Sequence, residues 1–174
     1  MKRAVSDVPV LASNLLAAAK KHGLTIATAE SCTAGALATA LADAPGGGEQ
    51  FHCGFVTYTK QSKTIILGVP PRLIRTFTAV SQPVAEAMAR GCLARSPADF
   101  GIAVTGVAGP EPDEDNNPIG KILVAIALCD GGIWHRDYDF RKRARPAMRE
   151  AILKATLIFA LQCCEVAKVA KQAS

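Results

Sequence analysis

Ser31 stands between an apolar segment that predicts a buried strand (24–28) and an alanine- and leucine-rich segment that predicts a helix (34–42). At such a junction the first backbone N–H groups of the helix are unpaired and the helix end is positive. A serine hydroxyl there could attack a carbonyl group, and the same amides could hold the resulting oxyanion. Alternatively, Ser31 or Thr33 simply caps the helix, which is the commoner role at this position.

Cys32 is a rival nucleophile, since a helix terminus can lower the pKa of a thiol. A cysteine hydrolase also needs a histidine base, however. The three histidines are poorly placed for that role: His22 ends a predicted helix upstream, while His52 and His135 lie within or at the start of predicted strands.

Lys63 offers another way to activate a serine. A lysine can accept the proton only when it is neutral, so burial or nearby positive charge must lower its pKa from ~10.4 to about 7–8, at a cost of about 4 kcal/mol. Lys60, one helical turn earlier, is a candidate source of positive potential, and Tyr58 could donate a hydrogen bond or relay a proton. The alternative is that Lys63 is an ordinary solvated charge.

Short β-rich segments alternate with helical ones, which predicts an α/β fold, a three-layer α/β/α sandwich. A hairpin at Gly131-Gly132 makes the sheet mixed. Ligands collect at the carboxyl ends of strands in such sheets, so loops 30–35, 58–63 and 105–110 should meet there. The expected strands are 24–28, 51–58, 100–105, 120–129 and 133–140, and the expected helices are 7–22 with Asp7 as cap, 34–42, 59–67, 82–95 with Ser81 as cap, and 146–168.

Composition restricts the class of protein. A chain of 174 residues predicts a single domain, 1–174, and 49 % hydrophobic residues exclude a disordered chain. Apolar runs are too short to cross a bilayer, and Asp7 and Pro9 interrupt the signal-like start at residues 1–3. Six scattered cysteines without a CxxC pair predict neither a disulfide framework nor a zinc site, but free thiols in a cytoplasmic protein.

The net charge of +5 is unevenly distributed. Segment 111–115 is acidic and segment 141–145 is basic. The basic run is a solvated face, an anion site built on arginine, or a nucleic-acid contact; with 5 % aromatic residues, nucleic acid is the weakest interpretation.

Four motifs in order resemble the CinA C-terminal-domain family, which includes the nicotinamide-nucleotide amidases. The similarity is strong over about 24–128 and weaker in the flanking helices. The motifs are Thr28-Ala29-Glu30-Ser31-Cys32-Thr33-Ala34-Gly35, Gly54-Phe55-Val56-Thr57-Tyr58 with Lys63 and Leu67-Gly68-Val69, Ala79-Val80-Ser81, and Thr105-Gly106-Val107-Ala108-Gly109-Pro110.

The resemblance implies an amidohydrolase that converts nicotinamide mononucleotide into nicotinate mononucleotide and ammonia, in pyridine-nucleotide recycling, with no cofactor or metal. It implies Ser31 as nucleophile, Lys63 as general base and Tyr58 as their assistant. The implied substrate-binding residues are Thr105, Gly106, Arg145 for the phosphate, and Thr33. The family commonly self-associates, so a homo-oligomer is expected, and the apolar residues of the last helix (Ile152, Leu157, Ile158, Leu161) could form its interface, although they could equally be ordinary core.

The chain departs from the family pattern at several positions. Ala34 stands where glycine is usual, Lys60 replaces a common asparagine, acidic residues 111–115 replace a glycine-rich loop, and a Gly-Asp-Arg motif is reduced to 143–145. These changes motivate an alternative: a catalytically silent nucleotide-binding or interaction domain of the same fold.

Overall fold

The computed structural model describes residues 7–140 and 143–167, built around a five-stranded mixed sheet. The strand order is β2-β1-β3-β4-β5. β1 pairs in parallel with β2 and β3, whereas β4 runs antiparallel to both β3 and β5. The carboxyl ends of β1, β2 and β3 therefore lie at one edge of the sheet. The strands are β1 (Ile26–Glu30), β2 (Phe51–Val56), β3 (Phe100–Gly106), β4 (Lys121–Leu128) and β5 (Ile133–Asp139).

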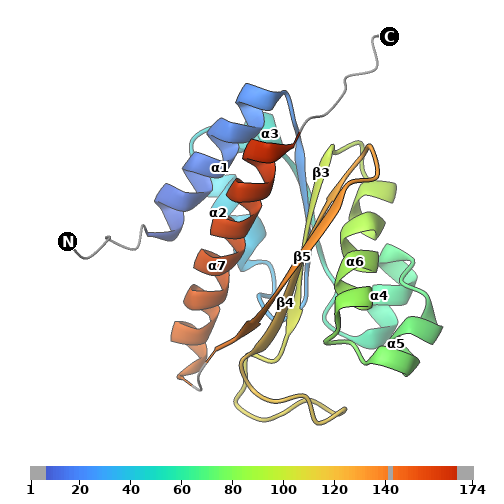
Figure 1. Ribbon diagram of the computed structural model, residues 1–174. Coiled ribbons are helices and arrows are strands. Elements are labelled where there is room, and N and C mark those ends of the chain that lie inside the picture. Colours follow the sequence, from blue (N-terminus) through green and yellow to red (C-terminus); the bar gives the residue numbers. More distant parts are fainter. Residues whose placement is uncertain (1–6, 141–142, 168–174) are drawn as a thin grey trace.

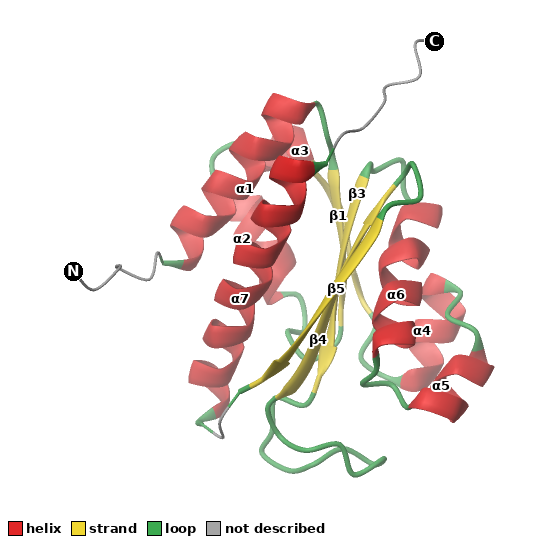
Figure 2. Ribbon diagram, viewed as in Figure 1, coloured by secondary structure: helices red, strands yellow, loops and turns green. Residues whose placement is uncertain are grey.

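Helices cover both faces of the sheet (Figures 1 and 2). One layer contains α1 (Val8–His22), α2 (Ala36–Asp43), α3 (Gly47–Gln50) and α7 (Arg145–Val166); the other contains α4 (Lys60–Leu67), α5 (Pro71–Phe77) and α6 (Gln82–Ala94). This arrangement confirms the predicted three-layer α/β/α sandwich with a mixed sheet.

The two faces of the sheet differ in side-chain size. In β3 and β4 the large residues, such as Phe100 and Ile122, join the core beneath α1 and α7, whereas small residues, such as Ala103 and Ala125, face α6. A Cβ at Gly101 would lie 2.6 Å from the Ala89 carbonyl oxygen, so α6 packs closely against β3.

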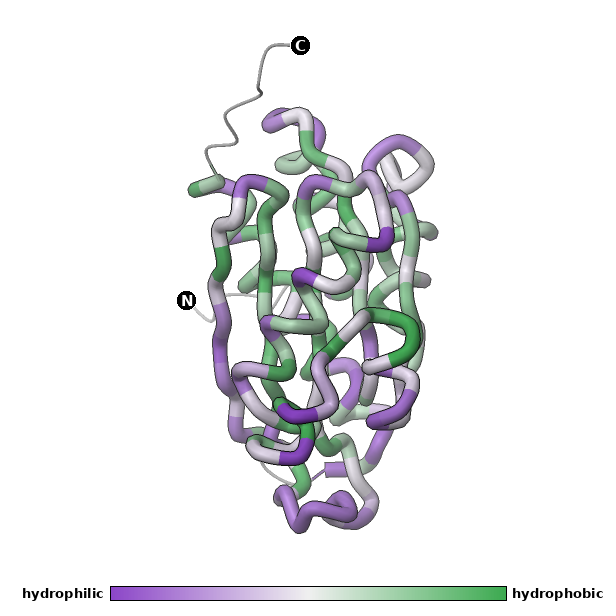
Figure 3. The backbone as a smooth tube through the Cα atoms, turned by 90° about the vertical axis from the view of Figure 1, so that its right-hand side faces the viewer, coloured by the Kyte–Doolittle hydropathy of each residue, from purple (hydrophilic) through white to green (hydrophobic). Residues whose placement is uncertain are grey.

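Residues 107–120 form a long loop between the antiparallel strands β3 and β4. Backbone hydrogen bonds between Val107, Gly120 and Lys121 close its base. Its tip is a run of hydrophilic residues that projects from the sheet, at the bottom of Figure 3. No helix in the described part of the chain is long and apolar enough to cross a membrane.

Several expectations about the elements need correction. Helices α3 and α5 are absent from the prediction, and β1 continues to Glu30 instead of ending at Thr28. Ile152 and Leu157 are fully buried in the chain's own core, so neither is free to form an interface between copies. The signal-like residues 1–3, the basic residues 141–142 and the expected helix end at 168 lie outside the described residues.

Candidate active site

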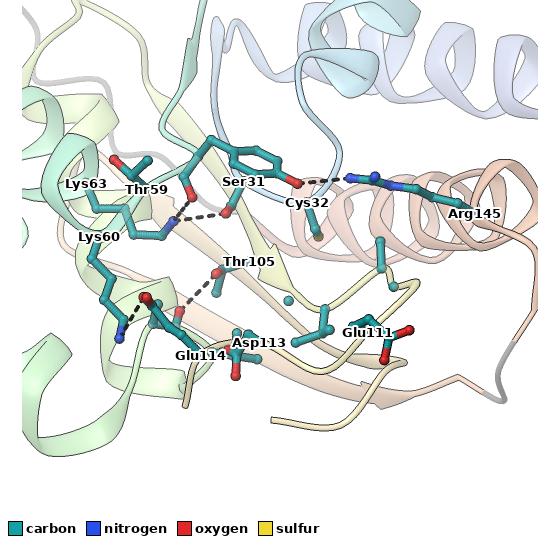
Figure 4. Close-up of a pocket in the computed structure, with 17 residues that line it drawn as sticks. Ser31, Cys32, Thr59, Lys60, Lys63, Thr105, Glu111, Asp113, Glu114 and Arg145 are labelled. Atoms are coloured by element: carbon teal, nitrogen blue, oxygen red, sulfur yellow. Dashed lines mark hydrogen bonds and ion pairs between the residues drawn. The ribbon is translucent and has the colours of Figure 1, made fainter. Parts of the chain in front are cut away.

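A pocket of about 390 Å³ opens where β1, β2 and β3 end (Figure 4). Ser31, Lys63 and Thr105 lie together in it. One wall comes from residues 58–60 at the start of α4, and the other from the 107–120 loop. The three loops that were expected to meet at this edge of the sheet do meet here.

The start of α4 fixes the position of Lys63. Thr59 is the N-cap of this helix: its Oγ1 accepts a hydrogen bond from the Ser62 N–H (3.0 Å), and the Ser62 Oγ accepts one from the Thr59 N–H (3.0 Å). This reciprocal capping box satisfies two N–H groups that the first turn would leave unpaired. Lys63 follows directly, on the buried face of α4, and its side chain points into the pocket.

Lys63 is 1 % exposed, and its Nζ lies 2.9 Å from the Ser31 Oγ. The same amine donates hydrogen bonds to the backbone carbonyls of Thr57 (2.8 Å) and Tyr58 (3.5 Å). Burial lowers the pKa of Lys63 from 10.5 to about 8, because removal from water disfavours the charged form. An appreciable fraction of this amine is therefore neutral near physiological pH.

Lys60 does not supply the positive potential expected of it. Its ammonium forms ion pairs with Asp115 (2.8 Å) and Glu114 (2.9 Å), and these contacts raise its own pKa. Because these carboxylates offset its charge, Lys60 has little effect on the pKa of Lys63. Loss of hydration alone lowers the pKa of Lys63.

Glu30 determines the geometry of the turn that carries Ser31. Its buried carboxylate accepts hydrogen bonds from the N–H groups of Gly35 (3.0 Å), Leu37 (3.0 Å) and Ala38 (2.8 Å) at the start of α2. The N-cap is Gly35, so neither Ser31 nor Thr33 caps this helix. Because Glu30 occupies these three amides, they cannot also hold an oxyanion, and that expectation was wrong.

Cys32 lines the pocket beside Ser31 but is unsuited to attack a carbonyl. Burial raises the pKa of its thiol to about 12, so the thiol stays protonated at neutral pH. No histidine lines the pocket within the described residues. The serine is the better nucleophile of the two.

Tyr58 and Arg145 close one side of the pocket. The guanidinium of Arg145, the first residue of α7, donates a hydrogen bond to the Tyr58 hydroxyl (2.9 Å), and both residues line the pocket. Both side chains are exposed to solvent, so an incoming ligand can reach them.

The other predicted substrate-binding residues differ in position. Thr105 is 1 % exposed and donates its hydroxyl hydrogen to the Ala79 carbonyl (2.9 Å). Gly106 lines the pocket, and a Cβ there would lie 2.6 Å from the Lys121 carbonyl oxygen, so close strand packing requires this glycine. Thr33 is fully buried and does not line the pocket, so the structure does not bring it to the site.

Sequence reasoning missed two features of the site. Glu30 lies within a recognised motif, but a carboxylate gives no local signal that it will be buried. The second is the contact between Lys60 and the acidic segment 111–115: these two departures from the family pattern meet across the pocket. Among the residues described, no group of histidine, cysteine and acidic side chains could hold a metal ion.

Comparison with known proteins gives consistent results. The sequence model of a protein family, the CinA C-terminal domain, matches residues 9–164 of this chain. A CinA-like protein of Chlorobaculum tepidum is 49 % identical over 112 residues, which are 63 % of this chain and 26 % of that protein. One from Mycobacterium avium is 42 % identical over 144 residues, 83 % of this chain and 32 % of its own length. The chain thus spans about a quarter to a third of the length of the curated relatives it matches.

Solved structures match over most of their length. The competence/damage inducible protein CihA from Agrobacterium tumefaciens has a TM-score of 0.84 and 36 % identity, covering 90 % of this chain and 96 % of its own. A CinA superfamily protein from Escherichia coli has a TM-score of 0.80 and 34 % identity, covering 93 % and 90 %. The comparisons of sequence and of fold therefore agree.

Proposed function

The chain belongs to the CinA C-terminal domain family, and on that premise we propose that it is an amidohydrolase acting on nicotinamide mononucleotide. The products would be nicotinate mononucleotide and ammonia. Ser31 is the nucleophile and Lys63 the general base, and residues 1–174 act as a single domain of this kind. One observation carries the proposal: a buried amine with a lowered pKa lies 2.9 Å from a serine hydroxyl in a pocket.

The surroundings of Lys63 suit a neutral amine. A neutral amine has two N–H donors and one lone pair. The carbonyls of Thr57 and Tyr58 can accept the two N–H groups, which leaves the lone pair for the Ser31 hydroxyl. In this state the serine donates to the lysine, which is the direction that proton transfer needs.

The reaction then proceeds in two halves. Lys63 takes the proton of the Ser31 hydroxyl as its oxygen attacks the carboxamide carbon. When the C–N bond breaks, Lys63 returns that proton to the departing nitrogen, and ammonia leaves. Water, deprotonated by Lys63, next attacks the acyl-enzyme ester, and the released Ser31 oxygen regains a proton from the lysine.

Two residues support the choice of substrate. The Thr105 hydroxyl donates its hydrogen to the Ala79 carbonyl, so toward the pocket the threonine oxygen can only accept a hydrogen bond. The N–H groups of a carboxamide substrate could donate that hydrogen bond. Arg145 can bind a phosphate and stands at the N-terminus of α7, where the helix dipole also favours an anion. Tyr58 holds the arginine at the opening.

The test is ammonia release from nicotinamide mononucleotide, nicotinamide riboside and the dinucleotide. Ser31→Ala and Lys63→Ala should each lose at least about 10³-fold in kcat, whereas Cys32→Ala should retain most of the turnover. Because the base is an amine, activity should survive EDTA. Full turnover in Ser31→Ala would disprove the mechanism. Nucleotide binding without ammonia release in the unmutated protein would instead support the silent binding domain.

A further inference from the structure

Lys60 joins the two walls of the pocket. It is the first residue of α4, where a positive side chain opposes the helix dipole. Its side chain is 34 % exposed and crosses to the 107–120 loop, where it meets Asp115 and also Glu114 (Figure 4). The Asp115 side chain is 24 % exposed and that of Glu114 is 71 % exposed, so the contact with Asp115 is the better shielded of the two.

The tip of this loop is a compact unit that can be held through one contact. The Asp113 Oδ1 accepts hydrogen bonds from the N–H groups of Asp115 (3.0 Å) and Asn117 (2.8 Å). The Asn117 amide nitrogen donates to the Asp113 Oδ2 (2.8 Å) and to the Thr78 Oγ1 (3.1 Å). Asn117 is 7 % exposed, so the tip is anchored on the side of Thr78, and Lys60 provides an anchor on the side of α4.

The loop forms the wall opposite Ser31 and Lys63. Glu111, Asp113 and Glu114 all line the pocket from this loop. Movement of the tip away from α4 would widen the pocket and expose its floor to water, without displacing the Ser31–Lys63 pair, which sits on other elements. The position of the loop therefore affects binding more than chemistry.

We propose that Lys60 is a positioning residue that fastens the 107–120 loop to α4 through Asp115 and Glu114, and so sets the affinity of the pocket for its substrate. The expected effect on KM rests on the proposed function, whereas the expected effect on amide hydrogen exchange in the loop does not. Exposed and half-exposed ion pairs contribute modestly, so removing both should weaken binding about threefold to tenfold.

Three variants test the proposal. Lys60→Gln removes both ion pairs, and the double variant Lys60→Asp with Asp115→Lys restores one pair with its charges exchanged. Lys20→Gln is the matched control, because it breaks a surface ion pair with Glu49 (2.7 Å) on α1, away from the pocket. Amide hydrogen exchange over residues 111–117 is measured in the free protein, and KM and kcat for nicotinamide mononucleotide are measured alongside.

In Lys60→Gln, exchange over 111–117 should accelerate at least about threefold and KM should rise, while kcat stays within about twofold. The charge-exchanged variant should restore the slow exchange and the KM of the unmutated protein. Lys20→Gln should change neither the exchange rate nor KM. Unaltered exchange in Lys60→Gln would overturn the proposal. So would a double variant that recovers slow exchange but not KM, because Lys60 would then act on the substrate with its own charge. If the unmutated protein released no ammonia, the proposed function would fail, and the exchange data alone would decide the role of Lys60.

Discussion

Replacing Lys63 with methionine should change how stability depends on pH. Methionine has nearly the same length but cannot be charged. The pKa of Lys63 falls from 10.5 to about 8 on folding, which corresponds to about 3.5 kcal/mol at ~1.4 kcal/mol for each pH unit. Because Lys63 is 1 % exposed, solvent screening reduces this figure little. The unmutated protein bears this cost at pH 7, and Lys63→Met does not.

The sign follows from proton counting. Between pH 8 and 10.5 the unfolded chain holds a proton on Lys63 that the folded chain has released. The free energy of unfolding of the unmutated protein therefore rises with pH through this window, and below pH 8 the full cost is present. From pH 7 to pH 10 the unmutated protein should gain about 2–3 kcal/mol relative to Lys63→Met.

Urea denaturation of both proteins at several pH values between 7 and 10 measures this difference. Other groups that titrate in this range, such as the remaining lysines, contribute equally to both proteins and cancel. The absolute difference at pH 7 is less informative, since methionine leaves the Thr57 carbonyl without the donor it has in Lys63, at a cost of about 1–3 kcal/mol. The cost of the unpaired carbonyl is the same at every pH, so it does not alter how the difference in the free energy of unfolding changes with pH.

Parallel stability curves for the two proteins would refute the reasoning, because they would show that Lys63 titrates alike in the folded and unfolded chain. The activity of the unmutated protein provides an independent readout. If neutral Lys63 is the base, kcat/KM should increase about tenfold per pH unit below pH 8 and level off above it.

Three further predictions concern the scaffold and the opening of the pocket. Glu30→Gln should lower the free energy of unfolding by about 2 kcal/mol in urea, because a carboxamide has one acceptor oxygen for three N–H donors; an unchanged value would mean that the cap contributes nothing. Gly91→Ala should cost about 1–3 kcal/mol, since its Cβ would collide with the Leu67 carbonyl, whereas Gly48→Ala has open space and serves as control. Arg145→Ala should raise KM for nicotinamide mononucleotide at least about tenfold and leave nicotinamide riboside unaffected, and equal effects on both would exclude a phosphate contact.

The sequence predicts the main elements because local patterns specify them. The strand at 100–105 and the helix at 82–95 are each within one residue of the observed β3 and α6. The short helices α3 and α5 were missed: four and seven residues carry too little periodicity. The two prolines that open α5 at Pro70-Pro71 were an available signal.

The candidate site was predictable to a lesser degree. The residues alone leave Lys63 either as a base for Ser31 or as a solvated charge, and only the resemblance to a family favours the pair, since 32 residues separate them and no periodicity connects them. The roles of Glu30 and Lys60 could not be predicted, because each depends on which distant backbone or loop the fold brings to it. Charge in the sequence indicates that a partner is needed but does not say where it lies.

The carboxylate of Glu30 has a consequence for the direction in which a nucleotide enters. Helix N-termini attract phosphates, and α2 begins a few residues after Ser31. With an internal anion already seated there, a phosphate gains little from the N-terminus of α2, whereas the N-terminus of α7, which no side chain of the described residues caps, can receive it together with Arg145. We expect a mononucleotide to enter amide first, with its phosphate remaining at the rim.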